Sequence, residues 1–493
     1  MDIRKFLKQN RILLLILLLG LFLRVYGAKA MFMYGHDQDL EGWFIKDIVV
    51  NGHLRLIGQE TSTQGVFIGP IFYYLLIPFY LIFGMDPIGG VILTTLLGVF
   101  GVASFYFVFS KVFNKRTGLV AALIYAASYY TVFNDREVVP TMPVIIWTAW
   151  FFYALNLILK GKQKLGYVLS GVLAGLIWHL NVALVLVLPL IPVAFLFSKK
   201  KIDWRAVFWG VSFLFITSIP LILFELRHDF SQTRAIAYAL NSNQKDIISG
   251  VDKFRRVLLL ASKNAAGLVW GSVLPISYSW AVYLMLGIFI FIYTKKLISK
   301  NQFALIALWL VSYVAFFSFY SKILSEYYLN GMMVIWIAIL AVGVSYLLGK
   351  VQLMPWGFLV IFTFLSISFY RFFTAPINRS GYVERKTVVA EIKMDAEKRG
   401  YPCVAVSYIT NPGYEFGYRY FYYLEEMHVN RPESGSPVYT IVFPLKPIFG
   451  VDRTFGAIGL IYPDYKRYTK EGIEESCNGA NSNLTDPMFG YTQ

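Results

Sequence analysis

The sequence predicts an all-α bundle of membrane-spanning helices followed by a small α/β or α+β domain outside the membrane. Of its 493 residues, 57% are hydrophobic and only 15% are charged, which is more apolar surface than a soluble protein can bury. From about residue 375 the composition becomes that of a soluble protein. We therefore expect a transmembrane domain over residues 1–374 and an extracytoplasmic domain over residues 375–493.

The first span follows a basic N-terminal segment. Its apolar run, from Ile12 to about Tyr26, is long for a signal peptide, and no small-residue cleavage site follows it. We therefore expect an uncleaved span with a cytoplasmic N-terminus. Apolar runs of spanning length predict about eleven spans, at 12–27, 88–110, 117–133, 139–159, 166–181, 182–198, 205–225, 272–294, 302–320, 327–348 and 353–373.

Basic residues in the short loops set the predicted orientation. Clusters such as Lys199–Lys201 all lie on the cytoplasmic side only if the apolar run 67–84 does not cross the membrane. That run, which contains Pro70 and Pro78, is predicted to lie on or dip into the outer leaflet. The outer face then carries loops 28–87, 134–138 and 226–271, and the protein is expected in the cytoplasmic (inner) membrane.

The net charge of +16 does not indicate nucleic-acid binding. The basic residues lie between apolar spans, where they meet lipid headgroups, and no basic soluble domain interleaved with aromatic residues is present. Membrane lipids are therefore the expected partners of these charges.

The first outer loop contains an unusual acidic stretch, Gly35-His36-Asp37-Gln38-Asp39-Leu40-Glu41. Carboxylates this dense beside a bilayer indicate a functional site that acts on a lipid-borne substrate. The alternative is a solvated loop without a role. We take Asp37 and Asp39 as candidate catalytic residues and Glu41 as a candidate substrate-binding residue.

The second outer loop places Asp135 and Glu137 on either side of Arg136. These residues are candidates for substrate binding, and the alternative is a charge network that closes the bundle. Brought close to Asp37, the acids Asp135 and Glu137 would also provide hard oxygen ligands for a divalent cation, and a cation cofactor is left open.

Three further residues are candidates for substrate binding. Arg227 and His228 follow the seventh span, and His179 ends a shorter one. An Arg–His pair can clamp a phosphate through charge-assisted hydrogen bonds. A polar cap on a span end is the alternative for the pair, and a packed interfacial side chain is the alternative for His179.

The C-terminal region predicts a helix over 384–399 and short buried strands at 404–408, 438–443 and 457–462. Its two cysteines, Cys403 and Cys477, are the only ones in the chain. A disulfide and two free thiols are both compatible with the sequence.

The acidic first loop, the stretch Gly69-Pro70-Ile71-Phe72-Tyr73-Tyr74-Leu75-Leu76 and the second acidic loop together resemble the membrane-embedded GT-C glycosyltransferases. The resemblance is to the glycosyltransferase family 39 type, which includes protein-mannosyltransferase-like and aminoarabinose-transferase-like enzymes. It covers residues 10–230 and implies that Asp37 is the catalytic carboxylate. Because the chain has Asp37-Gln38-Asp39 where the family often has an Asp-Glu pair, Asp39 remains a competitor.

The resulting hypothesis is an inverting transfer of a hexosyl or pentosyl group from a polyprenyl-phosphate donor to a lipid, glycan or protein acceptor on the outer face. Asp37 would act as the base, and Arg136, Arg227 and His228 would stabilise the leaving phosphate. A transporter or flippase of lipid-linked saccharides, and a non-catalytic subunit of an envelope assembly, are the alternatives. A transporter should carry charges midway along its spans and an internal repeat, and the sequence shows neither.

Overall fold

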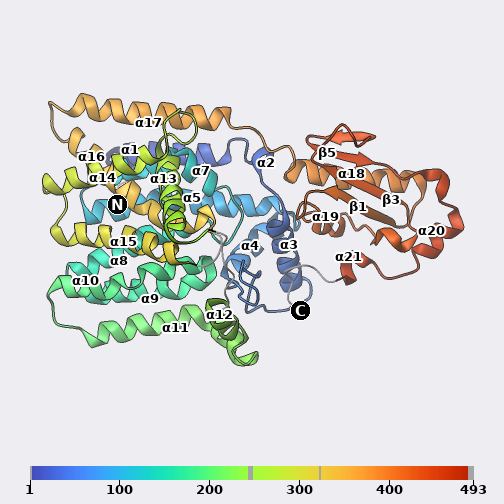
Figure 1. The fold of residues 1–493 in the computed structure, drawn as a ribbon, viewed down its shortest axis with the longest axis horizontal. Helices are drawn as coiled ribbons and strands as arrows, with labels where there is room; N and C mark the ends of the chain where they lie inside the picture. Colours follow the sequence, from blue (N-terminus) through green and yellow to red (C-terminus); the bar gives the residue numbers. More distant parts are fainter. Residues whose placement is uncertain (1–2, 242–247, 321–323, 487–493) are drawn as a thin grey trace.

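The structure is a computed structural model that describes residues 3–241, 248–320 and 324–486 (Figure 1). Long helices from the first 374 residues lie roughly parallel and form a bundle. The strands of the later residues form a sheet at one end of that bundle. The predicted fold class, a helical membrane bundle with a small sheet-containing unit, is confirmed.

Each predicted span coincides with a helix or with two consecutive helices. Their bounds are α1 Ile3–Val25, α5 Ile88–Val112, α6 Lys115–Ala127 with α7 Tyr129–Asn134, α8 Val144–Leu159, α9 Gln163–Leu180, η1 Val182–Val187 with α10 Leu190–Ser198, α11 Trp204–Arg227, α14 Ser279–Thr294, α15 Lys300–Phe319, η2 Glu326–Met332 with α16 Met333–Leu348, and α17 Met354–Thr374.

Among the described residues, five of these segments are long and apolar enough to cross a bilayer: α5, α11, α15, η2 with α16, and α17. Large apolar side chains such as Phe215 on α11 and Phe362 on α17 are exposed, as expected of faces that meet lipid. The protein is a membrane protein, and the number of spans stays a prediction.

Helix α4, Ile71–Ile82, lies within the run that was predicted not to cross. Twelve residues rise only about 18 Å, against roughly 30 Å of hydrocarbon. Phe72, Tyr73, Leu76 and Tyr80 are buried, and the helix packs on α3 and α5. Its length supports a position at the membrane surface.

The long loops also contain helices. The first loop forms α2, Ala28–Met31, and α3, His36–Val49. The later loop forms α12, Ser231–Asn241, and α13, Gly250–Val269, with residues 242–247 outside the described part. Helix α13 buries Val257, Ala265 and Leu268 and packs against α14 and α15, so it belongs to the bundle.

The C-terminal unit packs α18, Tyr382–Arg399, on a five-stranded mixed sheet of order β2-β1-β3-β5-β4. Strand β1 runs parallel to β2 and to the central strand β3, whereas β5 is antiparallel to β3 and to β4. The strands are β1 Val404–Thr410, β2 Val429–Asn430, β3 Val438–Phe443, β4 Arg453–Phe455 and β5 Ile458–Ile461, and the short helices are α19 Arg419–Leu424, η3 Pro432–Ser434, η4 Tyr465–Arg467, α20 Lys470–Ser476 and α21 Ser482–Thr485. Cys403 and Cys477 form a disulfide, which decides the alternative left open by the sequence.

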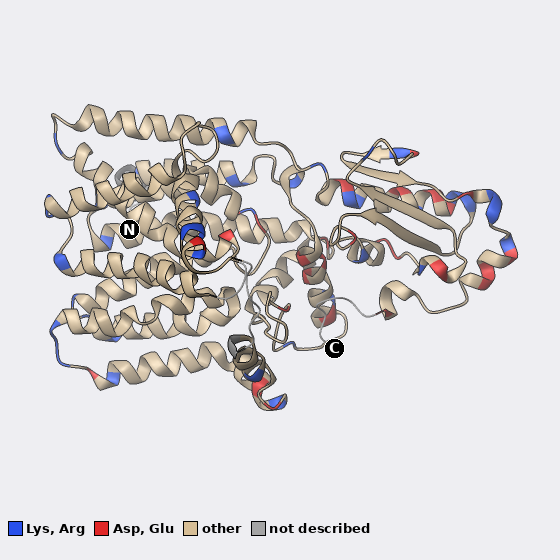
Figure 2. Ribbon diagram, viewed as in Figure 1, with Lys and Arg blue, Asp and Glu red and all other residues tan. Residues whose placement is uncertain are grey.

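Charge is unevenly distributed over the molecule (Figure 2). Lysines and arginines mark the helix ends farthest from the C-terminal unit, whereas acidic residues gather on α3 and in that unit. This distribution agrees with the orientation predicted from the loop charges.

Candidate functional site

Gln38 joins the two acidic loops. At the first turn of α3 its amide oxygen accepts a hydrogen bond from the Gly35 N–H at 2.9 Å. Its amide nitrogen donates to the carbonyl oxygen of Val138, in the second loop, at 3.0 Å. The residues next to Gln38 and Val138 in the sequence are Asp37 and Glu137, so this bond brings the two carboxylates into the same region.

Both carboxylates are exposed to solvent, yet protein surrounds them closely. Loss of hydration and the negative charge of Asp37 raise the pKa of Glu137 to about 6. Loss of hydration also raises the pKa of Asp37, and the neighbouring His36 partly opposes this rise. Two accessible carboxylates with raised pKa values can serve as a general base or as oxygen ligands for a cation.

Glu41 lies one helical turn after Asp37 on α3 but is completely buried. Neither carboxylate oxygen has a hydrogen-bond partner among the described residues. Burial, followed by the charge of Asp37, raises the pKa of Glu41 well above its ordinary value. The predicted substrate-binding residue is therefore an internal acid with no exposed surface.

Asp39 faces the C-terminal unit instead of solvent. It accepts hydrogen bonds from the Tyr34 hydroxyl at 3.2 Å and from the Tyr420 backbone N–H at 3.1 Å. Burial raises its pKa to about 6, although both hydrogen bonds act in the opposite direction. Of the two candidate bases, only Asp37 is accessible, and Asp39 is placed to hold α3 against α19.

The contact between α3 and α19 is close and aromatic. A Cβ atom on Gly42 would lie 2.5 Å from the Tyr420 ring, so a larger residue would separate the two helices. Trp43 packs against Tyr420 and Tyr423, with ring centroids 5.9 and 5.4 Å apart. The C-terminal unit thus fixes the position of the helix that carries Asp37.

Asp135 is not placed in the site, contrary to our prediction for substrate or metal binding. Its carboxylate forms an ion pair with Arg24, and both side chains are fully buried. Arg24 Nε donates to Asp135 Oδ2 at 2.9 Å, and the Tyr125 hydroxyl donates to Oδ1 at 2.8 Å. This pair links α1 to the α6–α7 region and corresponds to the alternative of a charge network that closes the bundle.

Arg136 has a comparable structural position. Its guanidinium donates to the backbone oxygens of Leu23 and Tyr26, each at 2.5 Å, and lies 4.9 Å from the Phe372 ring centroid. The side chain therefore joins the end of α1 to α17. The structure does not support our prediction that it binds a phosphate.

His179 is fully buried at the end of α9. Its Nε2 donates to the Thr217 carbonyl oxygen at 2.9 Å, and a Cβ on Gly69 would lie 2.0 Å from Nδ1. The Gly69 N–H in turn donates to the Trp178 carbonyl oxygen at 2.8 Å. His179 therefore packs the Gly69-Pro70 turn against the bundle and is closed to substrate.

Arg227 and His228 are exposed at the end of α11. His228 stacks on Phe224 with ring centroids 4.2 Å apart, and its Nδ1 donates to the Phe224 carbonyl oxygen at 2.8 Å. Within the described chain, no hydrogen bond or ion pair connects either residue to Asp37. Of the two arginines predicted to bind the phosphate, Arg136 and Arg227, only Arg227 is exposed.

Comparisons with known proteins support this architecture. Residues 68–224 match the family described as dolichyl-phosphate-mannose-protein mannosyltransferase. The structure of ArnT from Cupriavidus metallidurans, determined with bound undecaprenyl phosphate, is similar over 92% of this chain and 98% of that chain, with a TM-score of 0.62 and 12% identity. The chain has the GT-C fold. The resemblance noted in the sequence is thereby confirmed.

A second GT-C structure, the apo oligosaccharyltransferase of Archaeoglobus fulgidus, is similar over 90% of this chain and 70% of that chain, with a TM-score of 0.51 and 11% identity. No curated protein matches the sequence. At these identities the likeness establishes the GT-C fold and leaves the substrate to be argued from the site.

Sequence reasoning did not single out Tyr327 and Asn330, which lie in the same part of the structure. Tyr327, on the η2 turn, is exposed and close enough to Asp37 to interact with its charge. The turn is held by Asn330, whose side chain donates to Asn134 at 3.1 Å and accepts from the Tyr130 hydroxyl at 2.5 Å. With 34 tyrosines in the chain, nothing in the sequence distinguished Tyr327.

Of the three acids predicted as possible metal ligands, the structure leaves two in the site. Asp37 and Glu137 are close to each other, while Asp135 is bound to Arg24. In the parts of the chain that the structure describes, no group of three or more His, Cys, Asp or Glu residues forms a metal site.

Proposed function

We propose that this protein is an integral-membrane glycosyltransferase that moves a sugar from a polyprenyl-phosphate donor to an acceptor on the outer face of the cytoplasmic membrane. The observation that carries the proposal is the accessible pair Asp37 and Glu137, brought together by Gln38 at one end of a GT-C fold. Glycosyl transfer to a hydroxyl needs a base at the acceptor, and such a pair can supply one.

The lipid donor is supported by two of the comparisons. The matching family is described by a dolichyl-phosphate sugar donor, and the similar ArnT structure contains undecaprenyl phosphate. A donor that resides in the bilayer also explains why the acidic site lies at the end of a helical membrane bundle.

The orientation follows from charge and from redox chemistry. Basic loops lie at the end of the bundle away from the C-terminal unit, which favours a cytoplasmic position for that end. The disulfide between Cys403 and Cys477 is typical of an oxidising compartment. Both features favour an extracytoplasmic unit over residues 375–493 and an outer site.

In the proposed reaction, Asp37 removes the proton of the acceptor hydroxyl as its oxygen attacks the anomeric carbon. The bond between that carbon and the phosphate oxygen breaks, and the lipid phosphate leaves with both bonding electrons. Attack from the face opposite the phosphate inverts the configuration. The raised pKa of Asp37 suits a base that must hold this proton. Arg227 is the accessible cation that we assign to the leaving phosphate.

A divalent cation fits this site only as an ion shared between protein carboxylates and the donor phosphate. Magnesium-like ions are commonly held by one or two carboxylates together with substrate phosphates, and Asp37 with Glu137 would provide those carboxylates. Bound there, the ion would neutralise charge on the donor phosphate.

The test is sugar transfer in reconstituted liposomes from a panel of radiolabelled polyprenyl-phosphate sugars, each offered with lipid, glycan and peptide acceptors. Wild type is compared with Asp37→Asn and with the matched neighbour Asp39→Asn. We expect transfer by wild type and by Asp39→Asn, and loss of transfer in Asp37→Asn. Undiminished transfer by Asp37→Asn would refute Asp37 as the base. Absence of transfer by wild type with every donor would favour a transporter or a scaffold subunit.

Addition of EDTA to the wild-type assay tests the cation. Loss of transfer that magnesium restores would support the ion, and unchanged transfer would remove it from the proposal.

A further inference from the structure

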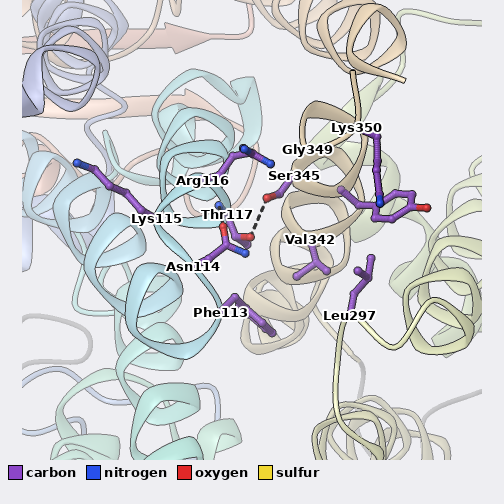
Figure 3. Close-up of a pocket in the computed structure, with 11 residues that line it drawn as sticks. Phe113, Asn114, Lys115, Arg116, Thr117, Leu297, Val342, Ser345, Gly349 and Lys350 are labelled. Atoms are coloured by element: carbon purple, nitrogen blue, oxygen red, sulfur yellow. Dashed lines mark hydrogen bonds between the residues drawn. The ribbon is translucent and has the colours of Figure 1, made fainter. Parts of the chain in front are cut away.

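A pocket lined by basic, hydroxyl-bearing and apolar side chains lies at the other end of the bundle from Asp37. It has a volume of about 500 Å³ and lies between the start of α6, the end of α16 and the turn before α15 (Figure 3). It is lined by Phe113, Asn114, Lys115, Arg116, Thr117, Leu297, Val342, Ser345, Tyr346, Gly349 and Lys350. None of these residues is acidic.

Two cations flank the pocket from different helices. Figure 3 shows Arg116 extending from α6 toward Ser345 and Gly349, with Lys350 at the end of α16, while Lys115 points away. Gly349 permits the approach of Arg116, because a Cβ there would lie 2.5 Å from the guanidinium. Arg116 and Lys350 form no ion pair with any residue that the structure describes.

The inner wall of the pocket offers hydroxyl groups. Thr117 and Ser345 are buried, and the Thr117 hydroxyl donates to Ser345 Oγ at 3.0 Å. This leaves the Ser345 hydroxyl hydrogen without an acceptor among the described residues. Asn114 caps α6 by accepting from the Thr117 N–H at 3.0 Å, so the positive end of the α6 dipole also faces this region.

Phe113, Leu297 and Val342 provide the apolar part of the lining. The helices that form the pocket continue as apolar segments of the membrane bundle. From the predicted orientation of the bundle, we expect the pocket where helix ends meet the membrane surface, at the depth of lipid headgroups. A ligand there would bring an anionic group to the two cations and keep an apolar part beside the bundle.

We propose that this pocket binds the headgroup phosphate of an anionic phospholipid, with Arg116 and Lys350 neutralising the phosphate and Ser345 donating to it. Basic pockets between membrane helices are suited to such headgroups. The proposed glycosyl transfer plays no part in this inference, which stands or falls separately.

Native mass spectrometry of the full chain tests the proposal, with dioleoylphosphatidylglycerol as the probe and dioleoylphosphatidylcholine as the neutral lipid. We expect wild type to bind phosphatidylglycerol more tightly than phosphatidylcholine. Each basic residue near an anionic lipid contributes about a five-fold gain, so Arg116→Gln with Lys350→Gln should weaken phosphatidylglycerol binding roughly 30-fold. Phosphatidylcholine binding should not change.

The matched control is Lys164→Gln with Lys201→Gln, which removes two exposed charges from the same end of the bundle, outside the pocket. Equal weakening in both double variants would show diffuse attraction and overturn the pocket. The exchange Arg116→Lys with Lys350→Arg keeps both charges and should retain most of the affinity. Displacement of the lipid by excess inorganic phosphate would assign the pocket to a soluble phosphate and overturn the lipid assignment.

Discussion

The buried pair Arg24–Asp135 separates two explanations of the second acidic loop. The sequence alone placed Asp135 at the substrate, whereas the structure pairs it with Arg24 in a fully buried position. The substitution Asp135→Asn keeps the size of the side chain and removes its charge. If the ion pair is structural, the variant should lose stability.

The expected loss follows from the contacts of Arg24. Removing one partner of a buried ion pair costs about 3–5 kcal/mol, because the other charge stays buried without compensation. Arg24 also donates to the carbonyl oxygens of Gly20 at 3.0 Å and Ala126 at 3.3 Å. These bonds remain in the variant, so we expect the lower end, a loss of about 3 kcal/mol in the free energy of unfolding.

The assay is unfolding by SDS titration in mixed micelles, compared with sugar transfer per folded molecule. The double variant Arg24→Met with Asp135→Leu removes both charges and should recover most of the lost stability, since apolar replacements of a buried pair are often neutral or stabilising. A variant Asp135→Asn that unfolds like wild type but transfers no sugar would refute the structural role and return Asp135 to the substrate.

Asp37→Asn should lower transfer by about 10²–10⁴-fold without lowering the free energy of unfolding, as measured in liposome and SDS assays. Asp39→Asn should keep transfer because its amide oxygen still accepts a hydrogen bond. Asp39→Ala, which has no acceptor, should cost about 1–3 kcal/mol of stability. Equal losses of activity in both Asp39 variants at full stability would contradict this structural role. Transfer by wild type should rise from pH 5 to pH 7 with a midpoint near 6, as Glu137, whose pKa is about 6, ionises. In Glu137→Gln, which has no carboxyl group to ionise, transfer should stay low across this pH range, and an unchanged pH profile would exclude Glu137. The pKa of Asp39 is about 6 in the folded chain against an ordinary 3.8. Its contribution to stability is therefore greatest below pH 4 and should fall as the pH rises to 6. Unfolding titrations of wild type and Asp39→Asn at several pH values measure this fall. Cys403→Ser should lower the free energy of unfolding by about 2–4 kcal/mol, and a reductant should then have no further effect.

Local patterns were sufficient to predict most of the fold. Span positions follow from runs of apolar residues and from lysines in short loops, and both are local properties of the sequence. The strand signals around Val404 and Val438 are local as well. The boundary near residue 375 stays a prediction.

The site was only partly predictable because side chains that are neighbours in the sequence point into different surroundings. Asp135 and Glu137 are two positions apart, yet one is buried against Arg24 and the other is exposed near Asp37. The distinction depends on Arg24, which lies 111 residues away from Asp135 in the sequence. Asp39 likewise finds its partner at Tyr420, 381 residues further along the chain. Loop composition cannot reveal such long-range pairs.

The attachment of Tyr420 to α3 also limits how the protein can be dissected. A chain ended before residue 375 would expose Trp43 and leave Asp39 without the backbone donor it now has. Lost activity in such a truncation would report a displaced α3 and would say nothing about acceptor recognition. Surface substitutions on the edge strand β4, at the exposed Thr454, leave that attachment intact. They are the cleaner means of asking whether the C-terminal unit chooses the acceptor.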